Sequence, residues 1–359
     1  MSIKNLLEVN SFKIFIGSII ICIFFFYFER LIGIEQFYHP DSLYYLKNHN
    51  NYSNFVNHPE KILFTGYHFL ARILNYNYLY LIILNFIVFG LTNILVFNLL
   101  LKNNLLNFNK LQVLIYSSIL FFDPYRLHLT GHVLKETILI FLIISFLCFK
   151  NLFIKTIFFF LSLFIKKNII FYYFIFYADN LIKKFFKIKK KIIYVYILIL
   201  LIFLIFLFFY EFNYFDKEHF SIFNYFFASK ANFFETLEIW HYRDMTGREY
   251  DNIPNFQNVS FPLGLIYKII AWPVLIFSGI FLFLTNSFLF KILGFMMIYL
   301  NVGIYYLTKK TYMSYGLLVL LILISIYSTT FTSYFRYSYV AIYCAIVFFF
   351  SNFSKCQKN

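Results

Sequence analysis

The sequence predicts an all-α integral membrane protein, a polytopic helical bundle with outer-face loops and interfacial helices. Of its 359 residues, 61% are hydrophobic and 13% are charged, whereas soluble domains have about 25% charged residues. Apolar runs that approach the length of a spanning helix recur along the chain. These runs are continuous and do not alternate, which disfavours a β-barrel. We therefore expect residues 1–359 to form a single membrane domain of about ten spans.

The first half of the chain alternates spans with short connections. The run 12-FKIFIGSIIICIFFFYF-28 has Lys4 before it and Lys13 at its start, and no small-residue cleavage pattern follows it, which predicts a retained anchor whose N-terminus is inside. Residues 29–76 are predicted to form a first outer loop, in which 62-ILFTGYHFLARIL-74 lies along the interface. The next expected spans are 78–101, 111–122 and 137–149, and residues 123–136 between the last two form a second outer loop.

The second half is organised by its Lys residues. Residues 152–177 hold two short apolar pieces split by Lys166 and Lys167, which favours a tight hairpin. The run 183-KKFFKIKKK-191 is typical of a cytoplasmic anchor on anionic lipid, and span 192–210 leads from it to a long outer loop, residues 211–262. Segment 263–285 contains 272-WP-273, so we expect it to break and re-enter. With spans at 287–307, 313–327 and 340–350, the Lys pairs and both termini are cytoplasmic.

Charge and cysteine usage exclude several classes of partner. The net charge of +15 fits cytoplasmic Lys clusters, so we expect no nucleic acid. The four cysteines show no CxxC spacing, which argues against a disulfide framework and a zinc site. The sequence therefore indicates no metal site and no cofactor, and it gives no sign of a divalent cation.

The predicted topology gathers polar residues on the outer side. All the arginines and all the histidines fall there, although Arg usually favours the cytoplasmic side. The stretch 123-DPYRLHLTGHVLKET-137, which contains the second outer loop, concentrates the hydrogen-bond donors Arg126, His128, His132 and Lys135 before the helix that Glu136 begins. An anionic headgroup at this site would explain the whole set. Snorkelling, salt bridges and the helix dipole explain its members one at a time.

The first outer loop contains a second polar group, 38-YHPDSLYYL-46. Its Pro-Asp-Ser sequence is typical of a turn, and the surrounding aromatic residues can stack on sugar faces. A carboxylate screened from water has a raised pKa, which suits a general base. We therefore take Asp41 as a candidate base, with His39 and Tyr44 as candidate sugar contacts.

At these residues the chain resembles the GT-C class of membrane glycosyltransferases and the related bacterial surface-polysaccharide polymerases, such as O-antigen polymerases. Asp41 matches the acid of their first outer loop, and Glu136 matches the acid that enters the helix after the second. Arg336, in 334-YFRYSYV-340, matches an Arg-aromatic motif before the final span. The chain lacks an acidic pair in the first loop and a large C-terminal soluble domain, which argues against a metal-dependent oligosaccharyltransferase.

The resemblance implies transfer of sugar from a polyprenyl-phosphate- or pyrophosphate-linked donor to a glycan or lipid-linked acceptor, at the outer face of a bacterial inner membrane. Asp41 would be the base, and Glu136 and His132 would position hydroxyls or orient cations. The donor phosphate would contact Arg126, Lys135 and Arg336. A lipid-linked sugar flippase or another polysaccharide transporter is the alternative, although transporters place charges within spans. A membrane O-acyltransferase should have a His within a span, and here every His is predicted in a loop.

Overall fold

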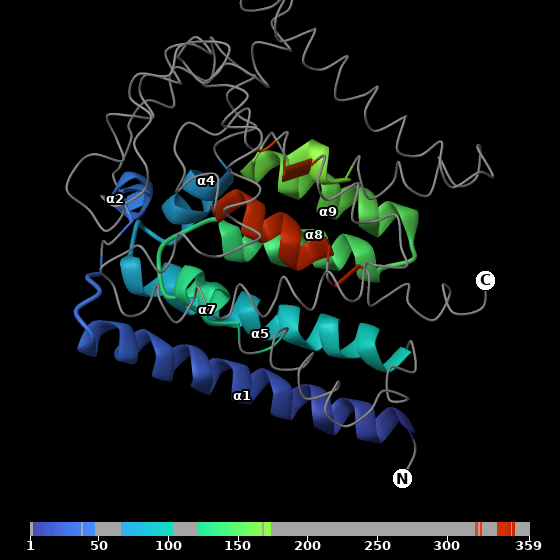
Figure 1. The fold of residues 1–359 in the computed structure, drawn as a ribbon. Helices are drawn as coiled ribbons and strands as arrows, with labels where there is room; N and C mark the ends of the chain where they lie inside the picture. Colours follow the sequence, from blue (N-terminus) through green and yellow to red (C-terminus); the bar gives the residue numbers. More distant parts are fainter. Residues whose placement is uncertain are drawn as a thin grey trace, which may run out of the picture. The chain divides into compact units, whose positions relative to one another are not determined.

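The computed structural model of the protein describes part of the chain. Its described residues are 3–36, 39–46, 66–102, 121, 123–166, 169–173, 320, 321, 324, 336–345 and 347–348. The regular structure of these residues is entirely helical, which confirms the all-α prediction for this part of the chain. The helices, labelled in Figure 1, are α1 (Ile3–Leu31), α2 (Pro40–Leu46), α4 (Gly66–Ile73), α5 (Tyr78–Lys102), α7 (Pro124–Thr130), α8 (Glu136–Cys148) and α9 (Leu152–Ile165).

Several predicted elements lie wholly or largely outside the described residues. They are the spans 111–122, 192–210, 263–285, 287–307 and 313–327, and the outer loop 211–262. The total of about ten spans therefore stays a prediction.

The chain divides into two units. One comprises Met1–Ile169 with Tyr343–Asn359, and the other comprises Ile170–Ile342. The helices named above belong to the first unit. In the second, the hydroxyl of Tyr172 donates a hydrogen bond to the carbonyl oxygen of Tyr337 at 2.9 Å.

Two helices are long and apolar enough to cross a membrane, judged by length and composition. They are Ser11–Leu31 within α1, with 21 residues, and Tyr78–Leu99 within α5, with 22 residues. A helix of this length covers the roughly 30 Å hydrocarbon layer. Large apolar side chains are exposed along α1 at helical spacing: Phe12, Ile16, Ile20, Ile23, Phe24, Tyr27 and Leu31. The predicted runs 12–28 and 78–101 are thus both confirmed as long apolar helices.

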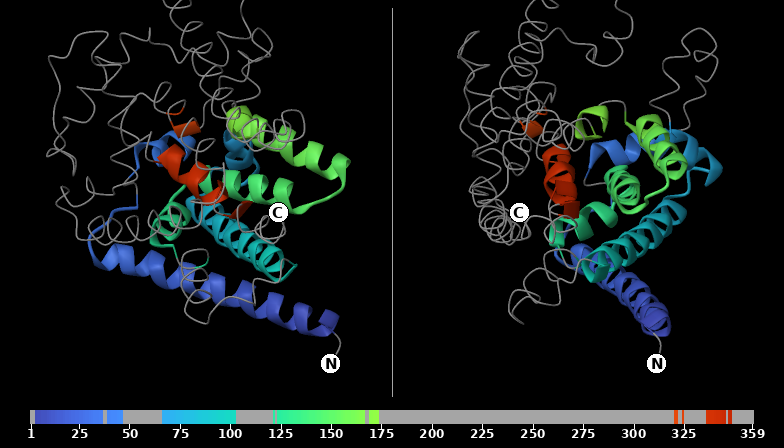
Figure 2. Two further views of the ribbon diagram at one scale, coloured as in Figure 1. Left: turned by 45° about the vertical axis from the view of Figure 1, so that its right-hand side comes forward. Right: turned by 90° about the vertical axis from the view of Figure 1, so that its right-hand side faces the viewer.

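Helices α1 and α5 lie side by side and run in opposite directions (Figures 1 and 2). At one end of the pair, Arg30 Nη2 donates to the hydroxyl of Tyr78 at 3.1 Å. Further along, Asn93 Nδ2 donates to Ser18 Oγ at 2.9 Å. The end of α1 therefore lies beside the beginning of α5.

Helix α8 packs against α5 on one side and α9 on the other. His132, just before the start of α8, contacts Asn85 of α5, and Cys148, at the end of α8, lies near Leu95 of α5. Helix α8 therefore runs parallel to α5. Ten of its 13 residues are buried, as expected for a helix that is apolar on all sides. Helix α9 returns antiparallel and brings Phe164 against Phe69 of α4. The short helices α2, α4 and α7 therefore gather at the end where α1 and α9 finish and α5 and α8 begin.

Local sequence signals explain where α1 ends and where α5 begins. Gly33 has φ +87°, and its N–H bonds Arg30 O at 3.2 Å while Ile34 N–H bonds Glu29 O at 2.9 Å. This pair of bonds is a Schellman motif, and glycine adopts its left-handed backbone without steric cost. At the start of α5, Asn77 Oδ1 accepts from the N–H of Leu79 at 2.9 Å, as an N-cap does.

Two predicted turns are helical instead. Pro40, expected in a turn, begins α2, because a proline at the first helical position needs no N–H partner. Residues 124–130 of the second outer loop form α7, because Asp123 Oδ1 caps it by accepting from the N–H of Tyr125 at 2.9 Å. The expected break at Lys166 is confirmed, since α9 ends at Ile165.

Candidate functional site

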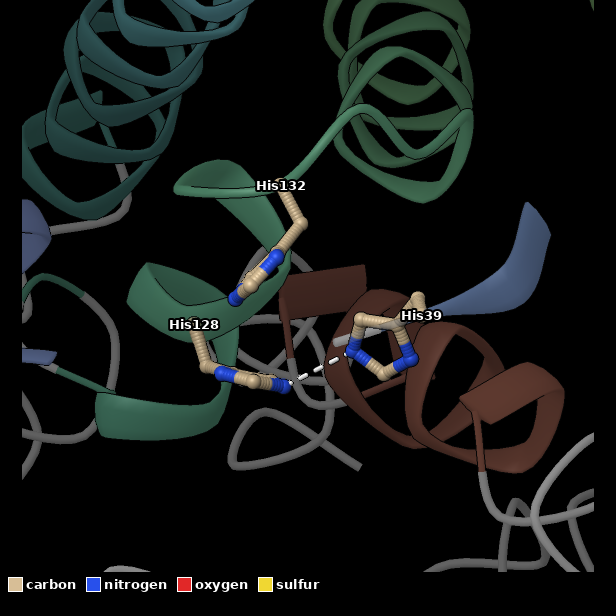
Figure 3. A group of neighbouring side chains, drawn as sticks. All are labelled: His39, His128 and His132. Atoms are coloured by element: carbon tan, nitrogen blue, oxygen red, sulfur yellow. Dashed lines mark hydrogen bonds between the residues drawn. The ribbon is translucent and has the colours of Figure 1, made fainter. Parts of the chain in front are cut away.

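Three histidines from two places in the chain converge where the short helices gather (Figure 3). His39 lies just before α2, His128 lies in α7, and His132 lies in the connection to α8. Their ring centroids are 5.0 Å (His39 to His128), 5.1 Å (His39 to His132) and 4.7 Å (His128 to His132) apart. One ligating nitrogen from each ring can be chosen so that all three lie within 4.8 Å of one another. The set therefore forms a compact imidazole triangle, which we call the histidine cluster.

A buried carboxylate supports the histidine cluster from α1. Glu29 Oε1 lies 2.6 Å from His128 Nδ1, and Glu29 Oε2 lies 3.6 Å from His132 Nε2. All three side chains are fully buried. A buried carboxylate is costly unless it is paired and hydrogen-bonded. One acid of α1 therefore contacts both imidazoles of the α7 region.

The carboxylate determines the tautomer of His128. An ionised carboxylate only accepts hydrogen bonds, so Nδ1 of His128 carries the proton. In a neutral ring this leaves a lone pair on Nε2. The Nε2 atom of His39 lies 2.9 Å from that atom and is its donor in this arrangement.

The backbone around the histidine cluster is held by specific contacts. Asn85 Nδ2 of α5 donates to the carbonyl oxygen of His132 at 2.8 Å. Thr130 Oγ1 donates to the carbonyl oxygen of Arg126 at 2.7 Å. A Cβ on Gly131 would lie 3.0 Å from Glu29 Oε2, so a glycine allows the carboxylate to approach the α7 turn. Residues 128–132 therefore pack closely against the carboxylate of Glu29.

Burial also determines the charge of His132. It lowers the pKa of the His132 imidazole to about 4, with the neighbouring Glu29 opposing the shift. The ring is therefore neutral at neutral pH. Neutral imidazole is the form that binds metal ions.

Arg126 lies deep among the helices of the first unit. Nη1 donates to Asn93 Oδ1 and to the hydroxyl of Tyr343, both at 2.6 Å, and Nη2 donates to the carbonyl oxygen of Phe89 at 3.2 Å. The guanidinium also lies 4.0 Å from the ring centroid of Phe89. Phe89 is at the middle of the Tyr78–Leu99 segment, so Arg126 stands level with the interior of that helix. Its predicted phosphate contact stays a prediction.

The two predicted outer loops approach each other at Lys135. Its Nζ lies 5.9 Å from the ring centroid of Tyr45 in α2, within the range of a cation–π contact. Tyr45 in turn packs edge-on against Tyr67 of α4 at 4.6 Å. Burial raises the pKa of Tyr67 well above its ordinary value, and the charges of Tyr45 and Glu136 add to the effect. Residues from both predicted outer loops therefore lie close together around Tyr45.

The remaining predicted site residues are placed as follows. Asp41 is half-buried in the first turn of α2, and Tyr44 lies within the same helix. Glu136 is fully buried in the first turn of α8. Arg336 is buried in the helical residues 336–345 and lies 5.3 Å from the ring centroid of Tyr337. Arg336 belongs to the second unit, and the other predicted site residues belong to the first.

Two residues that contact the candidate site residues, Glu29 and Asn93, were not singled out from the sequence. Glu29 ends the first apolar run, where an acid next to Arg30 is a detectable signal for a residue that faces protein. Asn93 is a polar residue within the second apolar run and has the same kind of signal.

Comparison of the chain with protein-family models, with curated proteins and with solved structures gives no match.

Proposed function

We propose that the chain is an integral membrane glycosyltransferase or polysaccharide polymerase. It takes sugar from a polyprenyl-phosphate- or pyrophosphate-linked donor at the outer face of a bacterial inner membrane. One observation carries the proposal: the segments 39–46 and 123–136 meet at one end of the apolar α1–α5 pair. His39 lies at hydrogen-bonding distance from His128 there, and Lys135 lies over Tyr45. A polar centre at the end of apolar helices suits a substrate with a charged headgroup and a lipid tail.

In this proposal, each residue has a role that follows from its chemistry. Asp41 takes the proton of the acceptor hydroxyl, and the nearby Tyr44 belongs to the same short helix. Lys135 stabilises the charge that develops on the leaving phosphate, and Arg336 is a separate candidate for a phosphate contact. Glu136 positions sugar hydroxyls, His132 orients the cations, and His39 and His128 link the two loops. The lipid tail lies against apolar helix faces such as that of α1.

A flippase for a lipid-linked sugar is the second candidate, because of the depth of Arg126. Ionisable groups level with the interior of a span mark substrate paths in transporters. Arg126 is fully buried and bonds Asn93 and Phe89 of α5. A flippase would move the lipid-linked sugar between leaflets without forming a glycosidic bond.

The test compares Asp41→Asn with Glu35→Gln in membranes that contain the full chain and a polyprenyl-linked sugar donor. Glu35 is an exposed acid just after α1 and serves as the matched control. Glycosidic product should fall by ~10²–10⁴ in Asp41→Asn, the range of general-base catalysis, and stay normal in Glu35→Gln. Membrane abundance is checked by immunoblot. Leaflet exchange of the donor with no product would favour the flippase, and normal product from Asp41→Asn would refute the assigned base.

A further inference from the structure

We propose that the histidine cluster binds one divalent transition-metal ion of the Zn²⁺ type, with His39, His128 and His132 as ligands and Glu29 as the carboxylate that orients two of them. The inference goes beyond sugar transfer and does not depend on it. It concerns which ion the chain holds, and its readout is metal binding.

The spacing of the rings fits ligands around one ion. Imidazole nitrogens bind Zn²⁺ at about 2.0–2.1 Å, so two of them on one tetrahedral ion lie ~3.3 Å apart. The Nε2 atoms of His39 and His128 are 2.9 Å apart, and the ligating atoms of all three residues lie within 4.8 Å. Shifts of a few tenths of an ångström to about one ångström would bring them to a common centre.

The orientation of the rings also fits convergence. The planes of His39 and His132 are inclined at 90°, and His128 makes angles of 59° with His39 and 58° with His132. Figure 3 shows His39 and His128 facing each other through their Nε2 atoms, with the ring of His132 beside that of His128. Three imidazoles whose ligand atoms lie this close together can reach a single ion.

Glu29 provides the support that metal-binding histidines usually have. Such histidines donate their other ring N–H to a carboxylate or carbonyl, which fixes the ring and raises its basicity. Glu29 engages Nδ1 of His128 at 2.6 Å and faces Nε2 of His132 at 3.6 Å. The opposite nitrogens, Nε2 of His128 and Nδ1 of His132, are then the ligating atoms.

Charge and ligand type indicate the class of ion. A divalent cation compensates the fully buried negative charge of Glu29 across the imidazole of His128. Neutral imidazole suits Zn²⁺, Cu²⁺, Fe²⁺ and Ni²⁺, whereas Mg²⁺ and Ca²⁺ prefer oxygen ligands. On binding, His39 exchanges its Nε2–H tautomer for the Nδ1–H tautomer, so no net proton is lost from that ring. Three protein ligands leave a fourth tetrahedral position for water or substrate, as in catalytic zinc sites.

The experiment measures Zn²⁺ binding to the full chain purified in detergent and stripped with a chelator. Zn²⁺ is titrated against a chromophoric competitor, and bound metal is counted by mass spectrometry. We expect one Zn²⁺ per chain in the wild type. Glu29→Gln should weaken affinity ~10–100-fold, and His39→Ala should weaken it by at least as much. His68→Ala is the matched control, because His68 lies against Tyr45 outside the histidine cluster and should bind normally.

Folding is monitored separately by the thermal unfolding midpoint with and without Zn²⁺. Because a ligand that binds only the folded chain stabilises it, Zn²⁺ should raise the midpoint of the wild type and of His68→Ala. The half-buried His39 is the ligand whose removal disturbs the fold least, and Zn²⁺ should raise the midpoint of its Ala variant by less than that of the wild type. The proposal is overturned if the stripped wild type takes up no Zn²⁺, or if His39→Ala binds it as tightly as the wild type.

Discussion

The Nε2 atoms of His39 and His128 lie 2.9 Å apart, although 89 positions separate these residues in the chain. The contact joins a segment that follows α1 to a segment that follows α5. It forms because Glu29, at the end of α1, holds His128 from the other side at 2.6 Å. The polar centre of the first unit is therefore a product of packing between the end of α1 and the α7 turn.

Glu29→Gln should destabilise the fold. The neutral amide removes the charge from the 2.6 Å hydrogen bond to His128 Nδ1, and the loss of a charged hydrogen bond costs about 1.5–3 kcal/mol. The thermal unfolding midpoint in detergent should fall by several degrees. Glu35→Gln, at an exposed position, should leave the midpoint unchanged. Equal midpoints for the two variants would contradict a supporting role for Glu29.

Gly131→Ala should disturb the histidine cluster through one methyl group. Its Cβ would stand 3.0 Å from Glu29 Oε2, and the buried carboxylate has no solvent to move into. We expect Zn²⁺ affinity to fall by roughly tenfold, the lower end of the effect of a disturbed orienting group. Gly17→Ala is the matched control on α1.

At Gly17, a Cβ meets nothing within 4 Å. Alanine is favoured over glycine in a helix interior by about 1 kcal/mol, so Gly17→Ala should leave Zn²⁺ binding intact and raise the unfolding midpoint slightly. The same Zn²⁺ titration and melting curve test both variants. A Gly131→Ala protein that matches Gly17→Ala in both measurements would show that the close approach has no consequence.

Arg126→Lys should lower stability by about 3 kcal/mol, because a lysine cannot bond Asn93, Tyr343 and Phe89 together. Arg72→Lys, at an exposed position in the last turn of α4, should be silent. Unfolding midpoints and membrane abundance measure the effect. An Arg126→Lys protein that is fully stable but inactive in sugar transfer would instead assign the guanidinium to the substrate.

Arg336→Lys should reduce sugar transfer by ~10²–10³, because a point charge replaces a planar fork at the proposed phosphate contact. Lys309→Arg also conserves charge, and its residue is predicted to be a cytoplasmic anchor, so activity should be normal. Both variants are assayed with the polyprenyl-linked donor at matched membrane abundance. Equal activities would remove Arg336 from the proposed site.

Reporter fusions test the predicted topology. Fusions at residues 187 and 358 should both report the cytoplasm, because Lys residues cluster near each position. Alkaline phosphatase should be inactive and a cytoplasmic fluorescent protein active at both positions. A periplasmic signal at either position would require a different number of spans.

The sequence by itself determined the helical character of the described residues and the two long apolar helices. Continuous apolar runs predict helices directly, since spanning length and hydrogen-bond satisfaction depend on local sequence. It also indicated Glu136 at a helix start and a break at Lys166, which are local signals. Pro40 and Asp123 carried such signals as well, but Pro40 was expected in a turn and Asp123 in a loop, whereas they begin α2 and cap α7.

Only the tertiary structure decided what the polar residues contact. Whether His39 faces His128 depends on the antiparallel packing of α1 and α5 and on the turn at Gly131, and neither can be read from nearby residues. Arg126 shows the same limit, because its partners Asn93 and Tyr343 lie 33 and 217 positions away. Helix formation is a local property of composition and capping, whereas the histidine cluster and its carboxylate arise from contacts between segments far apart in the chain.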